Sequence, residues 1–134
     1  MKEELTLEQY RNAIYLDFEG EGKKNDVAPL PQMAGLFVPG PRGNSGTHHC
    51  VFFRRSWEII SQHIPSSSQR NFNDFFESLA AKLQLEDKHL IFWSQHEEEV
   101  LGRYLNKDTF TDIQRLSINV LKNTRRYLTR RKIH

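Results

Sequence analysis

The stretch that decides the fold is Ala13-Ile14-Tyr15-Leu16-Asp17-Phe18-Glu19-Gly20, an apolar run that ends in two carboxylates and a glycine. A nearly continuous apolar run of this kind predicts a buried central strand over residues 13–18. Because side chains alternate faces along a strand, we expect Asp17 and Glu19 to point the same way. Like charges held that close repel each other unless a cation lies between them. The pair therefore predicts a site for a hard divalent cation such as Mg²⁺, which prefers oxygen ligands.

The same pair has a simpler interpretation, in which the strand ends and the chain enters a solvated loop. Gly20 and Gly22 would supply the turn in that case. However, Asp17 lies inside the apolar run, and an unpaired acid in such a position costs stability. This cost favours a functional role for the acids, and their place at a strand end suits two-metal phosphodiester chemistry on a nucleic acid.

Length and composition limit the number of domains and the class of protein. The 134 residues are enough for one domain with a core, and we treat residues 1–134 as a single domain. No apolar run approaches the length that spans a bilayer, and the acidic start of the chain does not read as a signal peptide. Cys50 is the only cysteine, which excludes an internal disulfide and fits a reducing cytoplasm. No zinc-ligand spacing is present in the sequence.

The order of predicted elements indicates an α/β fold with a mixed sheet flanked by helices. A meander of three strands is followed by a helical crossover to a fourth strand. We expect strands at residues 13–18, 33–38, 49–54 and 89–93, and helices at residues 6–11, 68–83, from 95 and 110–121, the last running on as far as 128. The segment Pro65-Ser66-Ser67-Ser68 is expected to be a loop that caps the second of these helices.

Three motifs resemble those of the DEDD-type 3′–5′ exonucleases of the ribonuclease H-like superfamily, in the branch associated with RecB-type nucleases. The first is Tyr15-Leu16-Asp17-Phe18-Glu19-Gly20, and the second is the strand entry Pro31-Gln32-Met33-Ala34-Gly35. The third is Leu90-Ile91-Phe92-Trp93-Ser94-Gln95-His96-Glu97-Glu98-Glu99-Val100-Leu101, a strand, a polar turn and an acid that opens a helix. The resemblance implies a ribonuclease H-like fold and a nuclease (a hydrolase) that uses Mg²⁺ or Mn²⁺ on single-stranded DNA or RNA.

The resemblance also implies roles for individual residues. Asp17 would bridge two metal ions, and Glu19 would bind one. Glu97 lies in the third of the segments quoted above, which corresponds to the family's second metal-binding motif, and it matches the metal-binding Asp of that motif. Asp112 resembles an Asp that follows this motif. The family's last motif, a His or Tyr shortly before a final Asp, has no counterpart before His134. We therefore expect a C-terminally truncated copy that is incomplete or weakly active.

Glu97 and Asp112 each have a structural alternative. Ser94 and Glu97 have the spacing of a capping box, in which the first residue caps the helix and the third helical residue bonds back. Thr109 and Asp112 have the same spacing. Capping and metal binding are both open for Glu97, whereas the structural role is favoured for Asp112.

The charge distribution is uneven. Seven of the 19 basic residues and none of the 17 acidic residues lie after Asp112, which gives this end +7 and the rest of the chain −5. A basic C-terminal segment, residues 122–134, on an acidic body is a footprint of nucleic-acid binding, with a solvated helix as the alternative. The basic residues expected to contact phosphates are Lys23, Lys24, Arg125, Arg126, Arg130 and Arg131.

Several other residues have a structural interpretation that is favoured over a functional one. His48 and His49 are adjacent on a strand and so face opposite ways, which makes surface polarity a better interpretation than chelation. Trp57 and Trp93 are expected to pack in the core rather than on bases, and Cys50 to be a small buried hydrophobe. Two other functions stay open: a degenerate relative that binds nucleic acid or a protein partner without cleaving, and an unrelated α/β interaction domain in which the acid pair is incidental.

Overall fold

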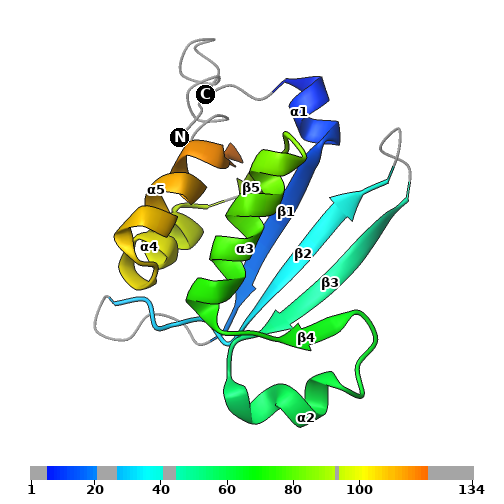
Figure 1. Ribbon diagram of the computed structural model, residues 1–134, viewed down its shortest axis with the longest axis vertical. Helices are drawn as coiled ribbons and strands as arrows, with labels where there is room; N and C mark the ends of the chain where they lie inside the picture. Colours follow the sequence, from blue (N-terminus) through cyan, green and yellow to red (C-terminus); the bar gives the residue numbers. More distant parts are fainter. Residues whose placement is uncertain (1–5, 21–26, 41–44, 93, 121–134) are drawn as a thin grey trace, which may run out of the picture.

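The computed structural model describes residues 6–20, 27–40, 45–92 and 94–120, and it has an α/β fold built on one mixed sheet (Figure 1). The strands, in sheet order β4-β3-β2-β1-β5-β6, are β1 Ala13–Glu19, β2 Met33–Pro39, β3 Gly46–Phe52, β4 Ser67–Gln69, β5 His89–Phe92 and β6 Ser117–Asn119. The helices are α1 Leu7–Arg11, α2 Glu58–Ser61, α3 Phe72–Leu85, α4 Gln95–Tyr104 and α5 Lys107–Leu116, with a 3₁₀ turn η2 at Arg55–Trp57.

The strand pairing confirms the predicted meander and crossover. β1 pairs antiparallel with β2, and β2 pairs antiparallel with β3. The chain then passes through α3 and returns as β5, which lies parallel to β1 on its other side. β6 continues the sheet parallel to β5, so β1 is a central strand, as its apolar sequence indicates.

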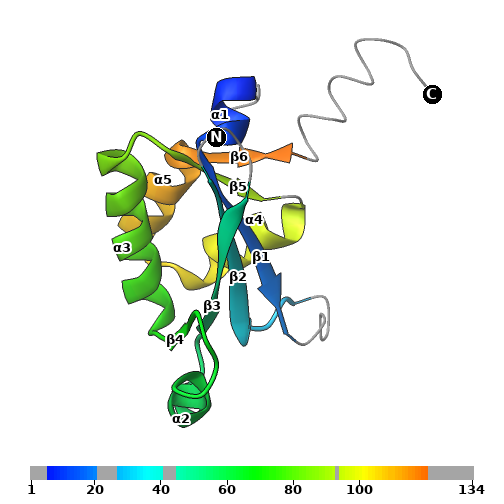
Figure 2. The same ribbon diagram turned by 90° about the vertical axis from the view of Figure 1, so that its right-hand side faces the viewer.

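The main core lies between one face of the sheet and the helices α3, α4 and α5 (Figure 2). Alternate residues of β1 point into it, namely Ile14, Leu16 and Phe18, because strand side chains alternate. α3 supplies an apolar stripe at helical spacing, with Phe76 and Leu83 fully buried. Rings of Phe18, Phe53, Phe72, Phe75 and Phe76 pack against one another with centroids 4.9–6.4 Å apart. This aromatic cluster joins the centre of the sheet to α3.

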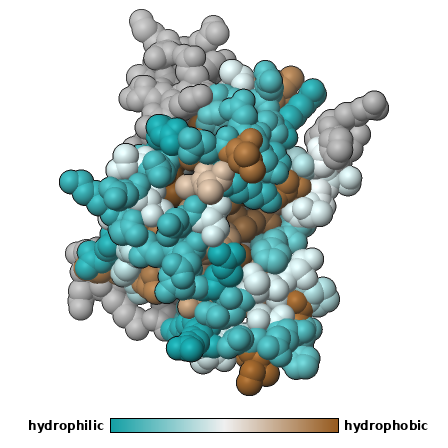
Figure 3. Space-filling model, in the orientation of Figure 1, coloured by the Kyte–Doolittle hydropathy of each residue, from teal (hydrophilic) through white to brown (hydrophobic). Residues whose placement is uncertain are grey.

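The outer surface on this side differs from the core beneath it. With α3 in front, the molecule is mostly hydrophilic, and apolar side chains form small patches (Figure 3). One patch lies over α2, which exposes Ile59 and Ile60. Across the residues described, no helix is both long enough and apolar enough to cross a membrane.

Several predicted element boundaries are wrong. The strand expected at residues 49–54 is β3, which spans Gly46–Phe52. α3 begins at Phe72 rather than at residue 68, because the side chain of Asn71 caps it by accepting from the Asp74 N–H at 3.1 Å. Residues 67–69 instead form β4, which pairs with β3 at the edge of the sheet. The sequence predicted a loop there and missed this short strand, because serine has a low strand propensity.

The last predicted helix also differs from the observed chain. α5 begins at Lys107, capped by Asn106, and ends at Leu116, after which residues 117–119 form β6. Ile118 is fully buried and packs against Ile91 of the neighbouring strand and Ala13. Apolar residues at Ile118 and Val120 fit a helix or a strand equally well in so short a run, and pairing with β5 selects the strand.

Candidate functional site

The carboxylates of β1 lie on the face of the sheet opposite the core. Asp17 and Glu19 are both exposed, whereas the intervening Phe18 is buried. They therefore share a face, as predicted. A hydrogen bond to Asp17 and the negative charge of that residue raise the pKa of the Glu19 carboxyl. Two interacting acids at the carboxyl end of a central strand form an anionic site with oxygen donors of the type that divalent cations prefer.

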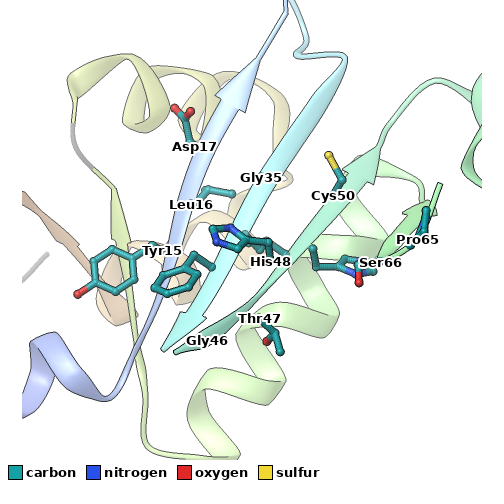
Figure 4. A pocket seen from close by; sticks show the side chains of 13 residues that line it. Tyr15, Leu16, Asp17, Gly35, Gly46, Thr47, His48, Cys50, Pro65 and Ser66 are labelled. Atoms are coloured by element: carbon teal, nitrogen blue, oxygen red, sulfur yellow. The ribbon is translucent and has the colours of Figure 1, made fainter. Parts of the chain in front are cut away.

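A groove of about 770 Å³ runs over this face beside Asp17 (Figure 4). Its floor is made by β1, β2 and β3, and Pro65 and Ser66 contribute to its wall. Gly35 of β2 lies at the middle of the floor, in register between Asp17 and Cys50. A Cβ atom there would meet only the Asp17 carbonyl oxygen, at 3.9 Å, so the absence of a side chain at Gly35 leaves open space above the strand.

A row of rings lies next to the carboxylate along the same face. Tyr15 of β1, Phe37 of β2 and His48 of β3 are aligned by the strand register. The ring centroids of Tyr15 and Phe37 are 6.1 Å apart, and those of Phe37 and His48 are 4.6 Å apart. Gly46 leaves room for this row, because a Cβ atom at that position would lie 2.5 Å from the Val38 carbonyl oxygen and 2.6 Å from the Phe37 ring. The ring planes are tilted by 44° and 35° in these two pairs, and the groove therefore combines an aromatic side with an acidic side.

Two titratable side chains of the groove, Tyr15 and Cys50, have raised pKa values. Partial burial, with a smaller effect of Tyr10, raises the pKa of Tyr15 to about 12, and its hydroxyl donates to the Tyr10 carbonyl at 2.7 Å. Burial also raises the pKa of the Cys50 thiol. A neutral thiol is a poor nucleophile. Cys50 is only half-buried and lines the groove, so the prediction that it is a small buried hydrophobe is wrong.

Glu97 lies in a different environment from the exposed pair. It is the third residue of α4, is only 5% exposed, and accepts a hydrogen bond from the Ser94 hydroxyl. Ser94 is the N-cap as predicted, but its side chain does not cap the backbone, so the predicted capping box is wrong. Among the described residues, no three His, Cys, Asp or Glu side chains lie where they could hold a metal ion together. The structure thus does not gather Asp17, Glu19 and Glu97 into one such group.

Asp112 lies on the exposed surface of α5. Its carboxylate is 3.6 Å from the guanidinium of Arg115, one turn further along the helix. Asp112 is not a capping residue, because α5 begins earlier and Asn106 caps it by accepting from the Thr109 N–H. The predicted capping box at Thr109 is therefore wrong, and this acid is also outside any three-residue metal group in the described chain.

The other sequence candidates divide into two sets. The six basic residues predicted to contact phosphates lie outside the described residues, as does Trp93: Lys23, Lys24, Arg125, Arg126, Arg130 and Arg131. Among the described candidates, Trp57 is half-buried and lies outside the two buried clusters, so its predicted place in the core is wrong; its ring centroid is 5.3 Å from that of Phe52. The imidazole of His49 lies 3.1 Å from the Ser68 hydroxyl, whereas that of His48 packs at a tilt of 35° against the Phe37 ring, which is consistent with their pointing to opposite faces.

The row formed by Tyr15, Phe37 and His48 was not predicted from the sequence, although the sequence indicates the position of one of its members. Tyr15 has the same strand parity as Asp17, so its side of the sheet follows from the sequence. The alignment of Phe37 and His48 with it depends on the register of two hairpins. Their connections contain residues 20–32 and 40–45, too long to fix a register from turn type.

Comparisons with known proteins add no constraint to this site. No protein-family model matches the chain. No curated protein and no solved structure matches it either.

Proposed function

We propose that this chain is a divalent-metal-dependent nuclease domain of the ribonuclease H-like, DEDD exonuclease type, which hydrolyses phosphodiester bonds in single-stranded DNA or RNA. The observation that carries the proposal is the interacting pair Asp17 and Glu19, exposed at the carboxyl end of the central strand. The meander of β1, β2 and β3 followed by a helical crossover to β5 supports the fold assignment. The motif resemblance around Asp17 points to the same class.

Two carboxylates are enough for a substrate-dependent metal site. Mg²⁺ keeps several waters in proteins and is commonly bound by one or two carboxylates together with the phosphates of the substrate. Asp17 and Glu19 fit this mode, because both are exposed and neither is neutralised by a described ion pair. The bound cation would activate water and stabilise charge on the leaving oxygen. The two side chains would hold and orient it, and the open groove would admit the phosphate beside Asp17.

The experiment is a cleavage assay with a 5′-labelled single-stranded oligonucleotide and Mg²⁺ or Mn²⁺. We expect product formation that EDTA abolishes, and a loss of at least about 100-fold in Asp17→Asn and Glu19→Gln, since each removes a metal-binding charge. Asp112→Asn, an exposed acid on α5, is the matched control and should cleave like the wild type. Cleavage that persists in Asp17→Asn, or in EDTA, would contradict the proposal.

A second function is favoured by the burial of Glu97. Its carboxylate bonds to Ser94, and no third ligand joins Asp17 and Glu19 within the described part of the chain. This arrangement suits a catalytically degenerate domain that binds nucleic acid, or a protein partner, without cleaving. Binding without cleavage, lost when the basic residues 122–134 are removed, would support this second function over the first. A cytoplasmic location stays a prediction in either case.

A further inference from the structure

The ring row on the open face has no role in the metal site, and its geometry is specific. Tyr15, Phe37 and His48 come from three adjacent strands and are held in register. None is part of the main core: Tyr15 and Phe37 are half-buried and His48 is exposed. Figure 4 shows Tyr15 and His48 on the same side of the sheet as Asp17. A row of partly exposed rings on a sheet is a surface on which flat, apolar ligands can stack.

We propose that this row is a base-stacking platform for unpaired nucleotides, and that a phosphate next to the stacked base lies at the cation held by Asp17 and Glu19. This inference takes one element from the proposed function, namely that Asp17 and Glu19 bind a cation. The ring row and the row Asp17–Gly35–Cys50 are two residues apart along each strand, which is about 7 Å. This separation is within the reach of a single nucleotide. The platform thus selects single-stranded over paired nucleic acid.

The empty position above Gly35 supports this occupant. A side chain at Gly35 would fill the space between the rings and the carboxylate, whereas glycine leaves it open. The groove volume of about 770 Å³ lies in the range of small-ligand sites. Because the bases of a duplex are already stacked on one another, their faces cannot reach the rings without unpairing. A base in single-stranded nucleic acid has a free face, and every base can use it, so we expect little sequence preference.

Charge distinguishes a nucleic acid from a peptide in this groove. Among the residues described, no Lys or Arg lines the groove, and its acidic side repels a phosphate on its own. A divalent cation at the carboxylates reverses this repulsion, so nucleic-acid binding must need the cation. A basic peptide would bind the free carboxylates directly, and the cation would weaken it. Cation dependence therefore separates the two occupants.

The test is fluorescence anisotropy with labelled dT8 and rU8 in Ca²⁺, which commonly supports binding with little or no cleavage, and in EDTA. Phe37→Leu keeps an apolar side chain but removes the π-face, and Gly35→Val fills the groove floor. We expect each to weaken binding by about 5- to 150-fold, the range for loss of one stacked base. Ile59→Ser, on the exposed surface of α2, is the matched control and should bind like the wild type. Circular dichroism and thermal melts would verify that each variant is folded.

The outcomes separate this inference from the nuclease proposal. Equal affinity of wild type, Phe37→Leu and Gly35→Val, or equal affinity for dT8 and its duplex, would overturn the platform even if cleavage is observed. Binding that is stronger in EDTA would instead indicate a basic peptide partner and would also overturn it. Conversely, a platform-dependent affinity in a chain that never cleaves would uphold the platform and refute the nuclease activity. A comparison of dT8 with rU8 would show which nucleic acid is preferred.

Discussion

The two faces of the central sheet differ in almost every property, although the same strands build both. Along β1, the residues Ile14, Leu16 and Phe18 are buried under the helices, whereas Tyr15, Asp17 and Glu19 alternate with them on the opposite face, where Tyr15 and Asp17 line the groove. The covered face contains the aromatic cluster, and the open face contains the rings, the glycine floor and the acids. Because neighbouring residues of a strand point to opposite faces, the residues that stabilise the fold and those that form the candidate site alternate along the same strand.

The covered face is where substitution should cost the most. Phe76 is fully buried and its ring contacts four other phenylalanines. We expect Phe76→Ala to lower the free energy of unfolding by about 3–5 kcal/mol, because it removes buried surface and leaves a cavity. Urea denaturation followed by circular dichroism would measure the change. Phe37→Ala on the open face is the comparison, and a loss as large as that of Phe76→Ala would show that the two faces contribute alike.

Glu97 tests the difference between a buried acid and the exposed pair. Removing the buried Glu97 side chain leaves the half-buried Ser94 hydroxyl without this acceptor. We expect Glu97→Ala to reduce stability by about 1–3 kcal/mol, the cost of a broken buried hydrogen bond. The measurement is again denaturant unfolding, with Glu77→Ala on the exposed side of α3 as control.

Metal affinity gives the second readout for Glu97. If the acid has only a structural role, Mn²⁺ affinity measured by calorimetry should be unchanged in Glu97→Ala and strongly reduced in Asp17→Asn. Loss of Mn²⁺ binding in the folded Glu97 variant would instead assign this acid to the metal site, as the motif resemblance implies.

The exposed pair predicts a pH effect with a definite sign. Asp17 raises the pKa of Glu19 in the folded protein, so the folded state binds more protons than the unfolded state just above the ordinary Glu pKa. This contribution to stability is present below that ordinary value and is lost as the pH rises through the raised pKa of Glu19. We expect Asp17→Asn to lower the Glu19 pKa, observed by carboxyl NMR titration, and to flatten the fall in stability over this window. A bound divalent cation should also lower it, and an unchanged Glu19 pKa in Asp17→Asn would refute the coupling.

The covered face was largely predictable from the sequence, and the open face was not. Apolar periodicity located β1, β2, β5, α4 and the body of α3, because burial leaves a regular pattern in the chain. The boundaries failed at Asn71 and at residues 117–119, where a cap and a strand pairing outweigh local propensity. The acid pair was visible because its two members belong to one strand. The ring row was not, since Phe37 and His48 reach Tyr15 only through the register of long connections.

Asp112 lies on neither face of the sheet, and its substitution should have the smallest effect on stability and on metal affinity. Its only described ion pair is with Arg115, at 3.6 Å on the exposed surface of α5, where solvent screens the attraction and both side chains keep much of their freedom. We therefore expect Asp112→Ala to change the free energy of unfolding by no more than about 0.5 kcal/mol. Manganese affinity and oligonucleotide binding should stay at wild-type values. A clear loss of metal affinity in this variant would mean that α5 approaches the carboxylates of β1 in the working protein, and that the open face is not the whole of the site.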